Sequence, residues 1–142
     1  MDVTQLPFNR LVGLETCPPE TGFLVALPAG PQYGNHLGTV HASALLAVAE
    51  AGSAAFLLQA LGPAAGFVPV VRRLEAKFRK PATGRIAARC PVPADDVAGW
   101  SAALADRGRV LAPVAVEVVD AGGVVVLSAV VEWFIARSGD AT

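Results

Sequence analysis

The segment Val40–Leu61 constrains the fold of this chain more than any other part of its sequence. Drawn as a helix, it is apolar on all sides and carries one acidic residue, Glu50. A helix of this kind is either buried in a core or crosses a membrane. Gly62 and Pro63 predict its end, and the apolar residues beyond it are interrupted by Pro69. We therefore interpret Val40–Leu61 as a buried core helix, and we expect no membrane contact.

Glu50 needs a physical reason to stand in such a helix. An ionised carboxylate is costly to bury unless a partner compensates for the lost water. A structural hydrogen bond or ion pair is one explanation, and catalysis is the other. The helix pattern alone leaves both open.

Length and composition narrow the class of protein. With 142 residues, the sequence predicts a single domain over residues 1–142 that is large enough for a core. The net charge of −1 argues against nucleic acid as a partner. Two cysteines, Cys17 and Cys90, do not make a disulfide framework, and the first ten residues do not form a signal peptide. We expect a cytoplasmic protein with reduced thiols.

Alternation of apolar and polar residues predicts the remaining elements. Strands are expected at Leu11–Cys17, Thr21–Leu27, Val68–Lys80, Arg85–Val92, Val110–Val119 and Val124–Ile135, and a short second helix at Asp95–Arg107. The first two strands should form a hairpin, and the last two should pair around a turn that begins at Asp120. Asp95 or Asp96 is expected to cap the short helix, and Gly108 to end it.

Two further expectations concern the strands. In Val68–Lys80, one face should carry apolar side chains and the other charged ones: Val70, Leu74, Ala76 and Phe78 against Arg73, Glu75, Lys77 and Arg79. The two Val-rich strands, Val110–Val119 and Val124–Ile135, are predicted to be central strands that are covered on much of both faces. Mostly antiparallel strands with one fully apolar helix predict an α+β fold, in which a curved sheet of about six strands wraps around that helix.

The helix start carries a recognisable spacing of residues. Its pattern is Asn-x-x-Gly-Thr-x-His-Ala-Ser followed by an acid nine residues after the histidine, formed by Asn35, Gly38, His41, Ala42, Ser43 and Glu50. This pattern resembles the hotdog-fold acyl-CoA thioesterases, in particular the branch named for phenylacetate degradation and 4-hydroxybenzoyl-CoA hydrolysis. The basic strand that ends in Phe-Arg-Lys-Pro-Ala and the Val-rich hairpin are similar to a subgroup of uncharacterised hotdog domains.

The resemblance implies a hydrolase of acyl-CoA thioesters that needs no cofactor. Glu50 would serve as general base or nucleophile, and the backbone N–H of Ala42 would stabilise the oxyanion. Asn35 would hydrogen-bond the attacking water or the thioester oxygen. Family members often place a Ser or Thr near the acid to assist it, and in this chain that helper is either missing or is Ser53. The usual His-Gly-Gly is replaced by His-Ala-Ser.

Substrate contacts are assigned to His41, Gly38 and Ser43 at the helix start, with His41 expected to be mainly structural. Arg72 interrupts the apolar face of its strand, so it is the first candidate to bind CoA phosphates, and Lys80 is the second. We interpret the other basic residues of that strand, Arg73, Lys77 and Arg79, as a solvent-exposed face. No spacing typical of a metal site is present.

Two alternative functions remain open. The chain could be a hotdog domain that binds acyl groups or only assembles, with Glu50 in a structural hydrogen bond. It could also be a hydroxyacyl-thioester dehydratase that uses His36 and Glu50. For the thioesterase we expect a homodimer, possibly a dimer of dimers, with antiparallel central helices, pairing through the basic strand Val70–Lys80 and an active site shared between two subunits.

Overall fold

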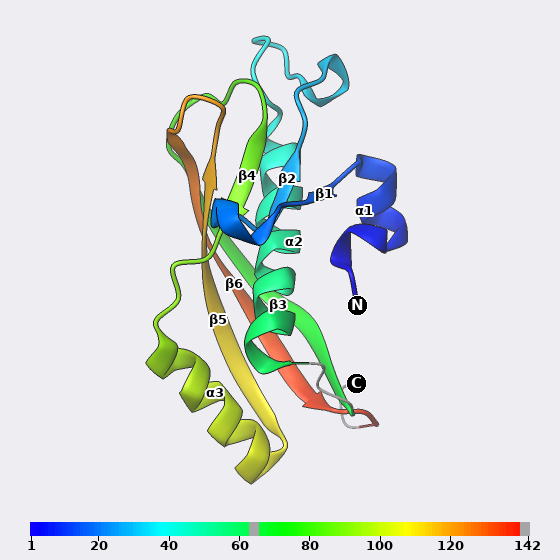
Figure 1. The fold of residues 1–142 in the computed structure, drawn as a ribbon, viewed down its shortest axis with the longest axis vertical. Coiled ribbons are helices and arrows are strands. Elements are labelled where there is room, and N and C mark those ends of the chain that lie inside the picture. The colour runs from blue at the N-terminus through cyan, green and yellow to red at the C-terminus, as the bar shows by residue number, and fades with distance from the viewer. Residues whose placement is uncertain (63–65, 140–142) are drawn as a thin grey trace.

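The computed structural model describes residues 1–62 and 66–139 and has the predicted curved sheet around one long helix (Figure 1). The strands are β1 (Glu15–Thr16), β2 (Val25–Leu27), β3 (Phe67–Phe78), β4 (Ile86–Arg89), β5 (Arg109–Val119) and β6 (Val125–Arg137). They form one antiparallel sheet in the order β1-β2-β4-β5-β6-β3. The helices are α1 (Pro7–Val12), α2 (Ala42–Leu61) and α3 (Ala94–Arg107).

Helix α2 runs along the inside of the curved sheet, where it packs against β2, β4, β5 and β6 (Figure 1). The helix approaches the sheet closely at Gly52, where an added Cβ atom would lie 2.5 Å from the Cβ of Ala88 in β4. By length and composition α2 would suffice to cross a bilayer, but here it is the core helix of the fold, which accounts for its apolar residues. Gly62 ends it, and Pro63 lies outside the described residues.

The two edges of the sheet differ in length. Strand β1 has 2 residues, whereas β3 has 12 and hydrogen-bonds to β6 on one side only. Short edge strands resist association, while a long, open edge favours pairing with another strand. The edge position predicted for the basic strand is confirmed.

The N-terminal prediction was wrong in part, because Leu11 and Val12 belong to helix α1 rather than to a strand. Pro7 stands at the first helical turn, and Gly13 follows the helix with a φ of 92°, a left-handed conformation that suits glycine. The predicted hairpin is confirmed in a shorter form, with Glu15 opposite Ala26.

A β-bulge corrects the predicted faces of β3. The register against β6 shifts between Val71 and Arg73, so Arg72 is the extra residue. Val70 therefore lies opposite Phe134 on the outer face of the sheet, while Leu74 lies opposite the buried Val131 on the inner face. An alternating sequence pattern cannot show that a bulge moves the residues after it to the opposite face of the strand.

Three smaller corrections concern the C-terminal half. Strands β5 and β6 are internal to the sheet, but their outer face is only partly covered, with Leu111 48% and Val130 41% exposed. Helix α3 begins after Pro93, which offers no side-chain cap, so Asp95 lies in the first turn instead of capping it. Gly108 ends α3 as predicted. The expected strand Arg85–Val92 is shorter in the structure, as β4.

Candidate active site

The start of α2 leaves one backbone amide free. His41 is the N-cap residue, and its Nδ1 accepts a hydrogen bond of 2.9 Å from the N–H of Ser43. The N–H of Ala44 is bound by the carbonyl of His41. Among the residues that the structure describes, the N–H of Ala42 has no acceptor, and Ala42 is exposed. A free first-turn amide at the positive end of a helix favours negative charge. The structural role expected of His41 is thus present as a cap.

Asn35 organises the loop before the helix. Its Oδ1 accepts from the N–H groups of Leu37 and Thr39 at 2.9 and 3.0 Å, and its Nδ2 donates to the hydroxyl of Thr39 at 2.8 Å. Gly38 in this loop has a φ of 77°, where a side chain would be strained. The amide of Asn35 is therefore engaged within its own loop, and the catalytic role assigned to it stays a prediction.

Glu50 lies half-buried on α2 and has no compensating partner. No N–H, hydroxyl or basic group in the described part of the chain donates to its carboxylate. Burial raises the pKa of Glu50 above its ordinary value of 4.5. The structural hydrogen bond or ion pair that would have explained this acid is absent from the described residues, which favours the catalytic explanation.

Ser53 does not assist the carboxylate of Glu50. Its hydroxyl is fully buried, donates to the backbone carbonyl of Glu50 at 2.7 Å and accepts from the indole N–H of Trp133 at 3.0 Å. Of the two possibilities that the sequence left open, the structure favours a missing helper, because the Ser53 hydroxyl is engaged by the backbone carbonyl of Glu50 and by the indole of Trp133 in β6. A buried indole N–H needs an acceptor, so Trp133 in an aliphatic strand was the sequence signal for this contact.

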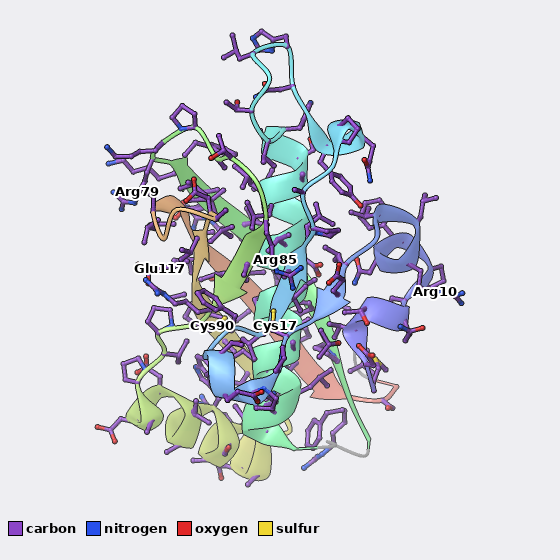
Figure 2. All side chains as sticks on the ribbon, turned by 45° about the horizontal axis from the view of Figure 1, so that its top comes forward. Arg10, Cys17, Arg79, Arg85, Cys90 and Glu117 are labelled. Atoms are coloured by element: carbon purple, nitrogen blue, oxygen red, sulfur yellow. The ribbon has the colours of Figure 1, made fainter. Side chains whose placement is uncertain are left out.

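The two candidates for binding phosphate lie in different places. The guanidinium of Arg72 lies 5.7 Å from the centre of the Phe134 ring, on the outer face of the sheet and away from α2. Arg72 breaks the strand pattern because it belongs to the bulge. Lys80 follows β3 at the end of the sheet where α2 begins, since the carbonyl of Ala82 accepts from the N–H of Val40 at 2.9 Å. Its neighbour Arg79 is labelled in Figure 2.

His36 and Glu50 are not brought together by anything in the described structure. His36 is exposed in the loop before α2, whereas Glu50 lies more than two helical turns beyond the helix start. In the described ranges, no group of three His, Cys, Asp or Glu side chains has the arrangement of a metal site.

Ala42 and Glu50 also cannot face one substrate atom within a single chain. They are eight residues apart, which is about 12 Å along the helix axis and about 80° around it. In addition, a first-turn N–H points out of the N-terminal end of the helix, away from residues further along it. A site that used both groups would therefore have to take them from two copies of the chain.

The chain matches a protein-family model described as "Domain of unknown function (DUF4442)" over residues 20–135. It belongs to this family. The comparison with curated proteins found no match.

Solved structures identify the fold of this DUF4442 protein. It is similar to a protein of unknown function and probable thioesterase from Pseudomonas aeruginosa, with a TM-score of 0.80 and 25% identity over 95% of this chain and 91% of the other. A thioesterase enzyme from Staphylococcus aureus gives 0.66 and 13% over 93% and 100%. A Bacillus halodurans protein crystallised with CoA gives 0.63 and 20% over 90% and 74%.

These neighbours are hotdog-fold members of the thioesterase superfamily, and the predicted hotdog fold is confirmed. The particular branch named from the sequence stays a prediction.

Proposed function

We propose that this DUF4442 protein hydrolyses acyl-CoA thioesters with Glu50 as its general base or nucleophile. The observation that carries the proposal is a half-buried carboxylate with a raised pKa and no partner in the described chain, on a helix whose first-turn amide is free. The thioesterase neighbours and the CoA-bound relative support the substrate class.

Each step of the reaction has a group to perform it. As a base, Glu50 takes a proton from water while the water oxygen attacks the thioester carbonyl carbon. The carbonyl oxygen then carries negative charge, which the N–H of Ala42 stabilises. Collapse of this intermediate breaks the carbon–sulfur bond, and the thiolate recovers the proton from Glu50. As a nucleophile, the carboxylate would instead form a mixed anhydride and release the thiolate, and water would then hydrolyse the anhydride.

A complete site needs Ala42 and Glu50 from two copies of the chain. Ser43, Ala47, Glu50, Ala54 and Leu61 share one face of α2 by helical spacing, and none of them is fully buried. This face is suited to an antiparallel α2 of a second copy, which would bring each Ala42 opposite the other Glu50.

The open edge of β3 supports the same arrangement. Val71 and Phe78 lie on its inner face, opposite Trp133 and Leu127, yet they are 41% and 49% exposed. Pairing of β3 with its symmetry mate would continue the sheet and place the partner helix over these side chains. A dimer of dimers and a cytoplasmic location are further proposals that rest on the sequence alone.

The test is release of free thiol from a panel of acyl-CoAs. Glu50→Gln keeps the shape of the side chain and should lower the rate by about a hundredfold or more. Glu20→Gln, at an exposed acid outside the site, is the matched control and should leave the rate unchanged.

Other outcomes would replace the proposal. Equal rates for Glu50→Gln and the unaltered protein would remove Glu50 from the reaction. Loss of water from hydroxyacyl-CoA without thiol release, abolished by His36→Ala, would identify the dehydratase. Tight acyl-CoA binding without turnover would identify a binding domain.

A further inference from the structure

The described chain contains a large cavity on the far side of α2 from Glu50. Its volume is about 890 Å³, and its walls come from the C-terminal half of α2, from β1 and β2 and from the first residues of the chain. Of its lining residues on α2, Ala55, Phe56 and Gln59 lie about 120–180° around the helix from Glu50, and Leu58 lies about 80° around it but about 12 Å further along the axis. The helix itself therefore separates this cavity from the proposed catalytic carboxylate.

The depth of the cavity is apolar. Val3, Cys17 and Val25 are buried at its floor, while Phe23 and Phe56 are half-buried in its walls. Protein interiors normally fill such space with side chains, and small-molecule sites are mostly apolar hollows of about 300–1,000 Å³. The size and the lining are those of a ligand site.

The polar groups around the cavity limit the charge of its ligand. Two charges belong to the described lining residues, the Asp2 carboxylate and the α-ammonium group of Met1, and both residues are exposed. Hydrogen bonds from Thr4 lower the pKa of the Asp2 carboxyl, so it is ionised at neutral pH. The Met1 charge is offset by that of Asp2, and the guanidinium groups next to the lining residues Cys17 and Phe23, those of Arg85 and Arg89, are paired with Glu15 and Glu117 at 3.1 Å. A ligand carboxylate or phosphate would therefore find no free counter-ion here.

We propose that this cavity is a second binding site, separate from the thioester site, for an uncharged apolar molecule of the long-chain alcohol type. The proposal does not depend on the proposed hydrolysis. Cys17 and Cys90, which follow β1 and β4 and are labelled in Figure 2, both line the cavity and contribute to its apolar surface. Burial raises the pKa of Cys90 to about 12, so it remains a neutral thiol.

The test is direct binding of the neutral fluorescent probe N-phenyl-1-naphthylamine, followed by its displacement. Saturable binding is expected in the unaltered protein, and decanol should displace the probe at least about tenfold more effectively than decanoate, which lacks a counter-ion. Equal displacement by the two, or no saturable binding, would overturn the proposal.

Three variants locate the probe. Ala55→Phe fills the cavity from α2 and should weaken binding at least about tenfold, while Ala102→Phe adds the same ring to the exposed surface of α3 and should not. Gln59→Trp narrows the mouth at an exposed position, so it provides the same test if Ala55→Phe does not fold. Unchanged affinity in the cavity variants, or displacement of the probe by acyl-CoA, would place it elsewhere and overturn the proposal.

Discussion

The indole N–H of Trp133 in β6 donates to the buried hydroxyl of Ser53 in α2, at 3.0 Å. The same hydroxyl donates to the backbone carbonyl of Glu50 at 2.7 Å. These two hydrogen bonds attach the helical turn that bears Glu50 to β6, which is the second strand from the open edge of the sheet.

Replacement of Ser53 by Ala should leave the Trp133 N–H buried without an acceptor. We expect the free energy of unfolding to fall by about 1–3 kcal/mol. Urea denaturation measures this loss, and Ser101→Ala, at an exposed position of α3, is the control with an expected change within about 0.5 kcal/mol. Equal effects of the two variants would show that the hydrogen bond from Trp133 does not stabilise the fold.

The raised pKa of Glu50 predicts how its replacement changes stability with pH. In the folded chain the carboxyl holds its proton more tightly than in the unfolded chain, where its ordinary pKa is 4.5. The unaltered protein therefore loses stability as the pH rises from there through the folded-state pKa. Glu50→Gln has no proton to lose at this position.

Relative to the unaltered protein, the stability of Glu50→Gln should therefore increase as the pH rises from 4.5 through the folded-state pKa of Glu50. Denaturation series at several pH values measure the difference between the two proteins. A difference that does not change with pH would mean that Glu50 has the same pKa in both states. Hydrolysis by the unaltered protein should in turn decline as Glu50 becomes protonated.

Much of the fold could be predicted from the sequence because its longest elements have strong patterns. Helix α2 and strands β3, β5 and β6 were predicted within a few residues. Helix α1 was missed because six residues are too few to show helical periodicity, and only Pro7 and Gly13 mark its ends.

The candidate site was less predictable. Glu50 stands out because it is the one acid in an apolar helix, and its position needs no knowledge of the tertiary structure. The outward position of Arg72 depends on a bulge, and the engagement of Asn35 depends on the loop that it closes. Neither can be read from spacing, because each depends on backbone geometry.

Lys80 is expected to contribute to CoA binding more than Arg72, since Lys80 lies at the end of the sheet where α2 begins. Lys80→Ala should raise the KM for acyl-CoA by about two- to fivefold, as befits an exposed charge contact, and leave the KM for a truncated thioester unchanged. Arg72→Ala also removes a basic side chain, so it is the matched comparison, and it should raise the KM for acyl-CoA less than Lys80→Ala does. If Arg72→Ala instead gives the larger and nucleotide-specific rise in KM, the order of the two residues is reversed.

Proline at position 42 removes the proposed oxyanion donor without breaking the helix. Ala42 is the first helical residue, where the N–H has no intrahelical acceptor and proline is tolerated. The preceding His41 has φ −61° and ψ 140°, a conformation that a following proline accepts.

We expect Ala42→Pro to fold normally and to lower hydrolysis by about a hundredfold or more. Ala94→Pro makes the same change at the first residue of α3, after Pro93 with φ −61° and ψ 143°, and should keep full activity. Full activity of Ala42→Pro, with the fold intact, would exclude this amide as the oxyanion donor.

The central claim is that Glu50 of one subunit and the Ala42 amide of the other form one thioester-hydrolysing site. The most direct test mixes equal amounts of Ala42→Pro and Glu50→Gln, unfolds and refolds them together, and measures thiol release from acyl-CoA. Random pairing makes half of the dimers mixed, each with one intact site of two, so the account predicts recovery of about a quarter of the unaltered activity. Mixed dimers that form in the expected amount but release no thiol would contradict it.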